Sequence, residues 1–474
     1  MTTKPCANIY DLPYYQDSCL YFERLRHLPY PVFLDSNAHA SNGRFDIVTA
    51  DPVSIISSSF NESNAPLFSK IDKDIDTHTT RGASHDRAPF VSGAIGVFSY
   101  DLGMQLNQLD PIKDNENAVW PLLIVGIYQW AIVQDHQQQQ AWLLCDPKQA
   151  PATSQTLLGL INKGRSIEKD QQAESLATFQ LQSDWVSSNS KNSYQSLFNS
   201  AMNYIEQGDC YQVNFAQQMS AKFTGDSWHA YKQLRKVSPT PFAAYFETPQ
   251  ASLMSLSPER FIQVQDKQVQ TQPIKGTRKR GSSEQEDVKL MSELSGSQKD
   301  RAENLMIVDL MRNDLGKCCK QGSIKVPKLF QIETHPNVHH LVSTVTAELS
   351  ETGVDQSLAL LKNSLPGGSV TGAPKKRAME IIDELENFSR SIYCGSVAYI
   401  NNSGNMDSNI LIRSLLAFKE DKDQTGTVQC WGGGGIVADS KADLEYEESL
   451  QKIRNILDAL KKMRKRATPV NAFN

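Results

Sequence analysis

The sequence predicts a mixed α/β protein, because two different hydrophobic patterns follow one another along its 474 residues. Residues 8–147 contain short apolar runs separated by turn residues, which is the pattern of strands. From residue 194 to about residue 462, segments with helical spacing alternate with strand-like segments. A chain of this length is sufficient for a large core and suggests two to three domains.

Within the first pattern, we expect strands at residues 32–34, 47–49, 95–98, 122–128 and 142–144. Residues 134–140 end in four glutamines and are predicted to form the loop of a hairpin. After Pro147 the composition becomes polar, with one short apolar helix expected at residues 157–161. We therefore divide the chain into an N-terminal region (1–150), a polar linker region (151–190), a main region (191–460) and a basic tail (461–474).

Three helices of the main region are predicted with a defined start or end. The first has apolar residues at helical spacing from Tyr194 and ends before Gly208. The second starts at the capping-box sequence that begins with Ser297, and it runs to Gly316. The same signature at Ser440 predicts the start of a third helix. The apolar seam expected for that helix consists of Leu444, Leu450, Ile453, Leu457 and Leu460.

Composition argues against several classes of function. Hydrophobic residues make up 39% and charged residues 21% of the chain, which is typical of a soluble globular protein. The net charge of −5 gives no general attraction to nucleic acid or to an anionic membrane. The longest apolar stretch, residues 121–133, is too short to span a bilayer, and the first residues lack a signal-peptide pattern. Eight cysteines without CxxC spacing fit a reducing compartment, so we expect a cytoplasmic protein.

Lys275 is the most informative single residue. It lies in the strand-like segment 271–278, directly before Gly276, and Glu259 lies sixteen residues upstream. Burial lowers the pKa of a lysine and converts its ammonium into a nucleophilic amine. A carboxylic acid on a neighbouring strand would then serve as a general acid. For a lone lysine a salt-bridged surface position is far commoner, so this hypothesis depends on the other motifs.

Two predicted helices each carry a pair of acids on one face. Asp300 and Glu303 are three residues apart on the helix that starts at Ser297. Glu445 and Glu448 have the same spacing on the later helix. Two such pairs would form a suitable cage for Mg²⁺, which binds few protein oxygens and keeps positions for water and an anionic ligand. Acids near helix N-termini also favour the helix dipole, so the pairs matter only if the fold brings the helices together.

Two glycine-rich loops are candidate anion sites. Residues 366–375 (PGGSVTGAPK) differ from a P-loop, because Ala373 follows Gly372 where lysine is required. Four consecutive glycines at residues 432–435 are costly in chain entropy, which suggests a ligand lying against the backbone. Arg413 lies in the apolar segment 409–416, which we expect to be a strand, so its guanidinium needs an internal acid or a substrate carboxylate as a partner.

These motifs together resemble the chorismate-utilising enzymes. The similar segments are SPERF (257–261), PIKGTR (273–278), DRAENLMIVDLMRNDLG (300–316), PGGSVTGAPK, YCG (393–395), IRS (412–414), GGGGIVADS (432–440) and EYEESLQK (445–452). The match spans residues from about 190 to 455 in unbroken order. Residues 33–36 and 43–46 also resemble the first domain of the same enzymes. The resemblance implies two interleaved antiparallel β-sheets packed face to face with helices on the outside, and a catalytic domain over residues 191–460.

The resemblance also implies a reaction. Lysine at position 275 is typical of the aminodeoxychorismate synthase branch of the family, whereas anthranilate synthases carry alanine there. The implied substrates are chorismate and ammonia, and the implied product is 4-amino-4-deoxychorismate, for p-aminobenzoate and folate. Lys275 would add at C2 while Glu259 protonates the departing 4-hydroxyl, and ammonia would then enter at C4 and expel the lysine. Anthranilate synthase component I is the alternative.

Roles for further residues follow from the same resemblance. Glu303 and Glu448 would hold Mg²⁺, with Asp300 and Glu445 nearby. Gln212 stands where isochorismate and salicylate synthases have a lysine base, and a neutral amide cannot deprotonate water. The residues expected to contact or shape the substrate are Gln212, Thr277, Gly368, Thr371, Gly372, Tyr393, Arg413, Gly433, Gly434, Gly435 and Lys452.

We also expect a glutaminase subunit as a partner and a possible site for tryptophan. None of the eight cysteines lies on a GxCxG elbow, so ammonia is expected from a separate glutaminase subunit. The N-terminal segments resemble the tryptophan pocket of anthranilate synthase, and the candidate pocket residues are Leu34, Ser36, Arg44 and Phe45. A non-catalytic subunit that only activates a glutaminase is a further alternative, and the presence of Lys275 and Glu259 argues against it.

Overall fold

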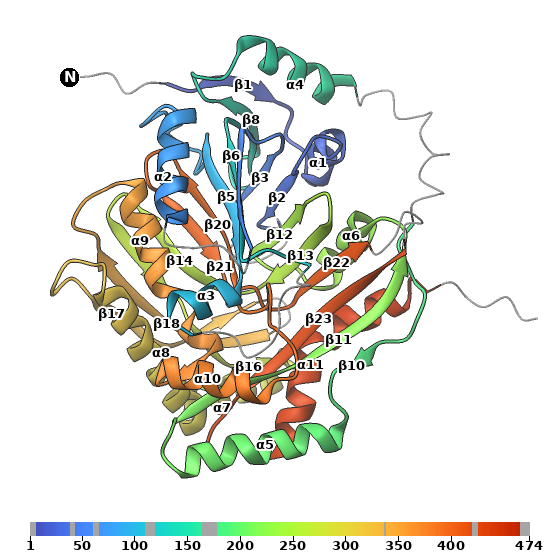
Figure 1. Ribbon diagram of the computed structural model, residues 1–474, viewed down its shortest axis with the longest axis vertical. Coiled ribbons are helices and arrows are strands. Elements are labelled where there is room, and N and C mark those ends of the chain that lie inside the picture. Colours follow the sequence, from blue (N-terminus) through green and yellow to red (C-terminus); the bar gives the residue numbers. More distant parts are fainter. Residues whose placement is uncertain are drawn as a thin grey trace, which may run out of the picture.

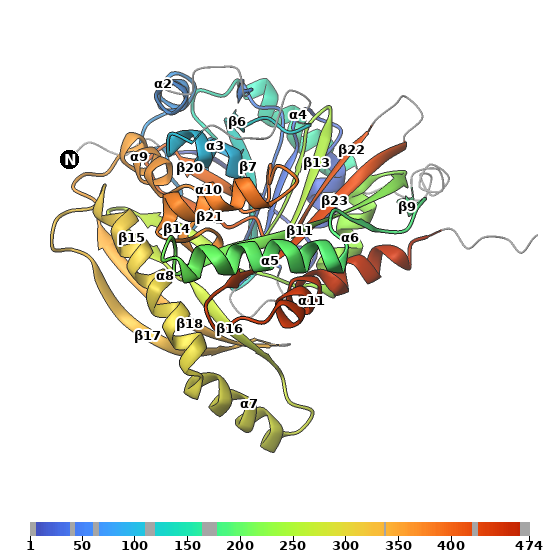
Figure 2. The same ribbon diagram turned by 60° about the horizontal axis from the view of Figure 1, so that its bottom comes forward.

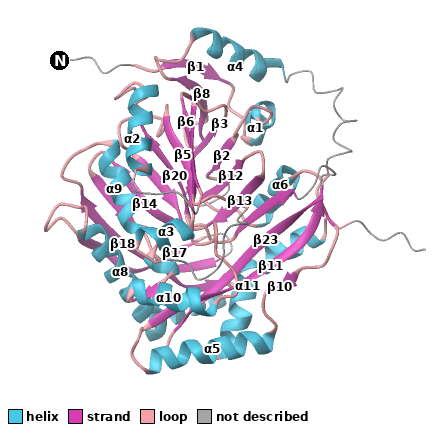
Figure 3. Cartoon of the chain, in the orientation of Figure 1, coloured by secondary structure: helices cyan, strands magenta, loops and turns pink. Residues whose placement is uncertain are grey.

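The computed structural model describes residues 6–37, 43–59, 66–109, 119–163, 178–335, 338–419 and 425–464. Two antiparallel sheets lie in the centre of the molecule, and helices cover them from outside (Figures 1 and 3). The sequence-based prediction of a mixed α/β protein with two such sheets is confirmed. No helix among the described residues is both long and apolar enough to cross a membrane.

The first sheet has 13 strands among the described residues. All of its pairings are antiparallel, and β9 (Gln180–Leu181) and β19 (Gly372–Ala373) join it through β11. Its other strands, in spatial order, are β1 (Asn8–Leu12), β8 (Gln140–Cys145), β7 (Trp130–Asp135), β3 (Phe45–Thr49), β2 (Val32–Asp35), β12 (Phe242–Glu247), β13 (Ala251–Ser257), β22 (Ser414–Lys419), β23 (Thr425–Ile436), β11 (Gln212–Thr224) and β10 (Val186–Ser187).

The second sheet has 10 strands in the described part of the chain, and β17 (Lys325–Thr334) joins it by pairing with β18. The other strands, in spatial order, are β16 (Ile274–Lys279), β18 (Val338–Glu348), β15 (Gln268–Thr271), β14 (Arg260–Gln265), β21 (Met406–Asn409), β20 (Ser396–Asn401), β5 (Gly93–Phe98), β6 (Leu123–Tyr128) and β4 (Ser54–Ser58). Strands from the N-terminal region and from the main region therefore contribute to both sheets, through the pairs β2–β12 and β5–β20.

Alternation of side chains along the strands produces two cores. Ile47 and Phe246 of the first sheet pack together with Val97 of the second sheet, so one core lies between the sheets. Their sequence neighbours Val48 and Tyr245 belong to the other core, on the opposite face of the first sheet.

Helices cover the outer faces of both sheets. In Figure 2, α5, α8, α10 and α11 lie around the sheets, and α7 extends away from them together with β16, β17 and β18. The helices are α1 (Cys19–Leu25), α2 (Leu67–His78), α3 (Tyr100–Leu106), α4 (Pro151–Lys163), α5 (Lys191–Glu206), α6 (Ser227–Val237), α7 (Glu284–Gly296), α8 (Gln298–Gly316), α9 (Val354–Ser364), α10 (Lys375–Leu385) and α11 (Ala442–Lys461), with a short 3₁₀ turn η3 at Gly368–Val370.

The predicted strands of the N-terminal region are present as β2, β3, β5, β6 and β8, and the predicted hairpin joins β7 to β8. The polar linker region contains α4, which is longer than the expected helix at residues 157–161, while residues 164–177 lie outside the described part. The basic tail is described only to residue 464. The division into regions itself remains a prediction.

The predicted helix starts differ in accuracy. Ser297 caps α8 by accepting a hydrogen bond from the backbone N–H of Asp300, as its capping box predicts. Ser440 does not cap α11, which begins at Ala442 without a side-chain cap. The Ser440 hydroxyl instead donates a hydrogen bond to Glu445 Oε1 at 2.7 Å. The capping-box assignment at Ser440 is therefore wrong, because this hydroxyl is bound to a side chain further along the helix.

Leu444 was predicted in the apolar seam of α11, but it is 65% exposed. Ile453, Leu457 and Leu460 of the same seam are buried. Leu444 and Ile453 are nine residues apart, about two and a half helical turns, so they project from opposite faces. The first turn of α11 thus turns its leucine outward and its acid Glu445 inward, where Glu445 is 4% exposed.

Candidate active site

Lys275 lies in an irregularity of the β16–β18 ladder. The register shifts between Ile274 and Thr277, so Lys275 and Gly276 are not part of the regular pairing. Gly276 has a φ of +81°, and a Cβ there would lie 2.8 Å from Leu294 Cδ1 and 2.9 Å from Asp300 Cγ. Glycine is therefore required next to Lys275. Such a bulge is a common way to redirect a functional side chain.

Glu259 lies directly before β14, close to Lys275. Strands β15 and β16 follow each other along the same side of β18, and β14 pairs with β15. Extending the register of Gln263 opposite Gln270 places Glu259 opposite Ile274. Burial raises the pKa of Glu259 to about 7, although hydrogen bonds from Ser369 and from the backbone of Ile274 and the charge of Lys275 oppose the rise.

The Lys275 amine has no hydrogen bond or ion pair with any residue in the described part of the chain. Burial lowers the pKa of Lys275. The charge of Glu303 opposes this change and the charge of Lys452 reinforces it. The pair therefore consists of an amine with a lowered pKa and a carboxylic acid with a raised pKa, as nucleophilic and general acid catalysis require.

The fold brings the acids of α8 and α11 together. Lys299 Nζ lies 3.9 Å from Glu303 Oε1 on α8 and 3.5 Å from Glu445 Oε1 on α11. Burial raises the pKa of Glu303, against the charges of Lys275 and Lys299. Lys299 and Glu445 are 146 residues apart in the chain. The spacing of acids within each helix could not establish that the two helices lie together.

The other two predicted metal ligands have cationic partners. Asp300 Oδ2 accepts from Arg278 at 3.0 Å, and Glu448 Oε1 pairs with Lys452 Nζ at 2.8 Å. Burial works to raise the pKa of Glu448, but the charge of Lys452 outweighs it and the pKa is lowered. Glu448 thus remains charged. Lys452 also donates a hydrogen bond to the Gly433 carbonyl at 3.0 Å, so it contacts both Glu448 and β23.

These acids fit a magnesium ion by their chemistry, although they are not arranged as a closed cage. Among the described residues, no three His, Cys, Asp or Glu side chains are grouped at metal-binding distance. An ammonium, that of Lys299, nevertheless lies between Glu303 and Glu445 and stands in for a cation there. Mg²⁺ prefers carboxylate oxygens and needs only one or two from protein. The donor set therefore suits it.

The four glycines of β23 have different structural reasons. A Cβ on Gly432 would lie 2.3 Å from the Ser449 carbonyl oxygen, so this glycine allows α11 to pack closely. Cβ atoms on Gly433 and Gly435 would lie 2.8 Å from the Tyr393 hydroxyl and from Gln212 Nε2. Gly434 is different, because a Cβ there would meet only the ends of charged side chains, Glu445 Oε2 at 3.3 Å and the Lys452 amine at 3.6 Å. Its backbone therefore lies directly beside charged groups.

Gln212 is a buried amide without partners. It begins β11, it is fully buried, and neither its Nε2 nor its Oε1 has a hydrogen-bond partner. A Cβ on Gly372 would lie 2.1 Å from the Gln212 carbonyl oxygen, so the glycine-rich loop approaches this residue closely. An unsatisfied buried amide costs about 1–3 kcal/mol, which a bound ligand would offset.

The loop of residues 366–374, called here the 366–374 loop, is fixed from two sides. The Lys375 amine donates to the Ser364 and Pro366 carbonyls at 3.1 and 2.9 Å. Within the loop, the Thr371 hydroxyl donates to the Gly367 carbonyl at 3.1 Å. A Cβ on Gly368 would lie 3.0 Å from side-chain atoms of α8, so this loop packs tightly against the acid-bearing helix.

A buried ion pair connects the 366–374 loop to β11. Arg390 and Glu386 pair at 2.7 Å with both side chains almost completely buried. Arg390 also donates to the Val370 carbonyl at 3.0 Å and to the Asn214 carbonyl at 2.8 Å (Glu386 accepts from the Ala216 N–H at 2.8 Å). This pair was not predicted from the sequence, because a Glu and an Arg four residues apart are common and carry no signal of burial.

Arg413 was expected within a strand, and this expectation is wrong. It lies between β21 and β22 with a φ of 51°, so the backbone turns at this residue. Burial lowers the pKa of Arg413, and no carboxylate in the described ranges pairs with it. Of the two partners considered, a ligand carboxylate is therefore favoured over an internal acid.

Tyr393 and Thr277 are two further residues that were predicted to contact or shape the substrate. The Tyr393 ring is buried and stacks on Trp431 with centroids 6.1 Å apart. Thr277 Oγ1 lies 2.9 Å from His340 Nδ1. Burial, and then the charge of Arg413, lowers the pKa of His340 to about 3, so this histidine is neutral. A neutral ring beside an unpaired guanidinium leaves Arg413 available for an anion.

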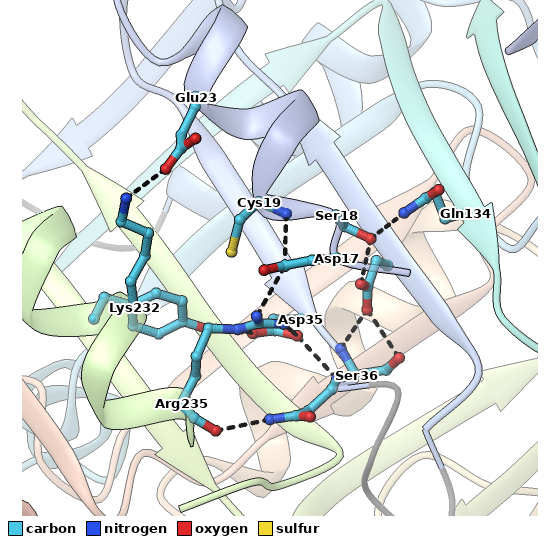
Figure 4. Close-up of polar contacts among 12 residues, drawn as sticks. Asp17, Ser18, Cys19, Glu23, Asp35, Ser36, Gln134, Lys232 and Arg235 are labelled. Carbon is cyan, nitrogen blue, oxygen red and sulfur yellow. Dashed lines mark hydrogen bonds and ion pairs between the residues drawn. The ribbon is translucent and has the colours of Figure 1, made fainter. Parts of the chain in front are cut away.

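A cavity of about 600 Å³ lies between residues of the N-terminal region and residues of the main region, such as Phe242 and Arg260. Leu34, Ser36, Arg44 and Phe45, the candidate tryptophan-pocket residues, all line it, and none of the predicted catalytic or metal residues does. Figure 4 shows the buried network behind Ser36. There Asp35 accepts from Arg235 at 2.7 Å, and the Ser36 N–H and hydroxyl donate to a second buried acid, Asp46, at 2.8 and 2.9 Å.

Comparison with known proteins decides the family. The family model described as chorismate binding enzyme matches residues 30–458. The chain belongs to the chorismate-binding enzymes. It is 42% identical over 454 residues to aminodeoxychorismate synthase component 1 of Escherichia coli, covering 93% of this chain and 96% of that protein.

Two further relatives are anthranilate synthases. Anthranilate synthase component 1 of Aquifex aeolicus is 36% identical over 364 residues, which covers 77% of this chain and 69% of that protein. The crystal structure of anthranilate synthase component I from Streptococcus pneumoniae has a TM-score of 0.75 at 27% identity, and the match covers 88% of this chain and 92% of that one. The fold is therefore that of this chorismate-binding family.

Two glycine substitutions separate packing from binding. Gly434→Ala adds a methyl group 3.3 Å from Glu445, so we expect chorismate to bind about tenfold more weakly with stability nearly unchanged. Gly432→Ala places the same group 2.3 Å from a backbone oxygen and should cost about 1–3 kcal/mol of stability. Calorimetric titration with chorismate and urea unfolding measure both effects. Equal binding by wild type and Gly434→Ala would show that this strand does not face the ligand.

Proposed function

We propose that the chain is the large subunit of an aminodeoxychorismate synthase, which converts chorismate and ammonia into 4-amino-4-deoxychorismate for p-aminobenzoate and folate. The decisive observation is the pair of Lys275, a half-buried lysine whose amine has no partner among the described residues, and Glu259, whose pKa is raised to about 7. The similarity to aminodeoxychorismate synthase component 1 supports the same activity.

The reaction proceeds by two displacements. The Lys275 amine adds at C2 of chorismate, the ring double bonds shift, and the 4-hydroxyl leaves as water after taking the proton of Glu259. Ammonia then adds at C4, the double bonds shift back, and Lys275 leaves from C2. Covalent catalysis of this kind divides one difficult substitution into two easier ones. Lys275 leaves as a neutral amine, and the ammonium group formed at C4 returns one proton to the Glu259 carboxylate.

The remaining residues bind and orient the dianionic substrate. Arg413, which has no internal acid partner, and Tyr393 take the enolpyruvyl carboxylate. Lys452 and the backbone of Gly433 to Gly435 face the ring carboxylate. Glu303 and Glu448, with Asp300 and Glu445, would hold Mg²⁺, which would supply positive charge to neutralise and orient the ring carboxylate. Gln212, Thr277, Gly368, Thr371 and Gly372 shape the pocket.

Ammonia comes from a separate glutaminase subunit. A glutaminase nucleophile needs a thiol with a lowered pKa. Burial instead raises the pKa of seven of the eight thiols, those of Cys19, Cys145, Cys210, Cys318, Cys319, Cys394 and Cys430. All eight cysteines are free, which supports a cytoplasmic location.

The product test distinguishes this activity from that of anthranilate synthase. With chorismate, Mg²⁺ and ammonium, the protein should form aminodeoxychorismate, and p-aminobenzoate should appear only after a separate lyase is added. Lys275→Ala should lose activity by at least about 100-fold, because the nucleophile is absent. In wild type without ammonia, a chorismate quench followed by intact mass analysis should show an adduct on Lys275.

Lys279→Ala is the matched control, since this lysine is exposed on the same strand β16. It should keep the wild-type rate and the adduct. Fluorescent anthranilate with pyruvate release from wild type would contradict the proposed activity. Unchanged turnover by Lys275→Ala would contradict the nucleophile role.

The first displacement should depend on pH through Glu259. The pKa of Glu259 is raised to about 7, so its proton is present below pH 7 and is lost as the pH rises through this value. In the absence of ammonia, the adduct should therefore form more slowly above about pH 7, even though a higher pH leaves more of Lys275 neutral. Glu259→Gln should slow the step by about 10²–10⁴-fold and abolish this alkaline decline. The same decline in the variant would assign it to another group.

We propose that the cavity lined by Leu34, Ser36, Arg44 and Phe45 holds tryptophan. Its volume of about 600 Å³ lies in the usual range of small-molecule sites, and apolar Leu34 and Phe45 lie beside polar Ser36 and Arg44. Denaturing the purified protein should release tryptophan into the filtrate, as chromatography would detect. Leu34→Trp fills the cavity and should release none, whereas Leu329→Trp, at an exposed position of β17, should release as much as wild type. Filtrates without tryptophan from wild type would refute occupancy.

A further inference from the structure

Lys299 has a position that the proposed mechanism does not use. It lies in the first turn of α8, and its amine is 3.9 Å from Glu303 and 3.5 Å from Glu445. Among the described residues, it is the lysine that contacts acids of both helices. Its side chain is 46% exposed, while those of Glu303 and Glu445 are 15% and 5% exposed. The amine can therefore move into solvent, and the two acids cannot.

The charges around Lys299 explain what it does in the absence of a metal. Arg278 pairs with Asp300, and Lys452 pairs with Glu448. Lys299 supplies the positive charge for the remaining two acids, Glu303 and Glu445. A dication bound between these acids would meet the ammonium at close range, and the two cations would compete for the same carboxylate oxygens.

We propose that Lys299 is a displaceable placeholder that keeps the Mg²⁺ affinity of the substrate-free site low. This inference rests on the magnesium site of the proposed function. The amine leaves the acids only when Mg²⁺ arrives, so the metal must displace an existing ion pair. Chorismate adds two negative charges to the site and shifts this competition toward the metal. Metal and substrate thereby bind as a nearly neutral pair, each strengthening the other by the same factor.

The test is the affinity for Mg²⁺ without substrate, measured by titration calorimetry on the whole chain. Lys299→Met removes the competing charge and should lower the Kd for Mg²⁺ about threefold to tenfold, the range for losing two weak, partly exposed ion pairs. Lys299→Arg keeps the charge and should keep the wild-type Kd within about twofold. Lys289→Met is the matched control, since Lys289 is an exposed lysine of α7 whose amine is 3.9 Å from Glu293. Its Kd should not change.

The possible failures are distinguishable. A Kd in Lys299→Met that is equal to or weaker than that of wild type would overturn the placeholder role while leaving the magnesium site intact. Wild-type protein without saturable Mg²⁺ binding would overturn both the metal assignment and the inference built on it. If Lys299→Met does not fold, as judged by its urea transition, Lys299→Gln provides the same loss of charge with a polar side chain and the same expected Kd.

Discussion

The proposed chemistry depends on one electrostatic constraint, because it requires the neutral form of Lys275 beside several carboxylates. Glu303, Glu259 and Glu448 all favour the protonated form of Lys275, and burial together with Lys452 opposes them. The cations paired with the acids therefore have a second effect beyond local stability. By neutralising Asp300, Glu448 and the Glu303–Glu445 pair, they weaken the negative potential that would otherwise keep Lys275 charged.

This constraint also explains why the surrounding backbone is so firmly fixed. A desolvated amine is useful only if its position relative to the acid and the ligand is set before the substrate arrives. The bulge at Gly276 sets Lys275, and the register of β14 sets Glu259. The Arg390–Glu386 pair binds the 366–374 loop and β11 to one another, so that the pocket walls come from elements far apart in sequence.

The sequence was sufficient for the fold class and the family, because both depend on patterns that are local or motif-like. The cap at Ser297 and the residues of the PIKGTR segment are examples. It was insufficient where the outcome depends on tertiary geometry. The contact of Lys299 with Glu445 requires α8 and α11 to lie close together. The Ser440 hydroxyl binds Glu445 instead of capping α11. Arg413 adopts a positive φ that an apolar segment does not indicate. The individual roles of the site residues remain predictions.

The unsatisfied groups of the site show why one scaffold can serve several chorismate reactions. Lys275, Gln212 and Arg413 all lack partners within the described residues, and each would be costly without a ligand. In the proposed function, Arg413 and a metal held by the helix acids would suit any chorismate-like dianion, so they would not determine which reaction follows. The proposed mechanism assigns that choice to Lys275 and Gln212, the two positions that would present a nucleophile and a neutral amide to the ring. The bulge of β16 positions Lys275 and the start of β11 positions Gln212, so the two side chains are set by different strands.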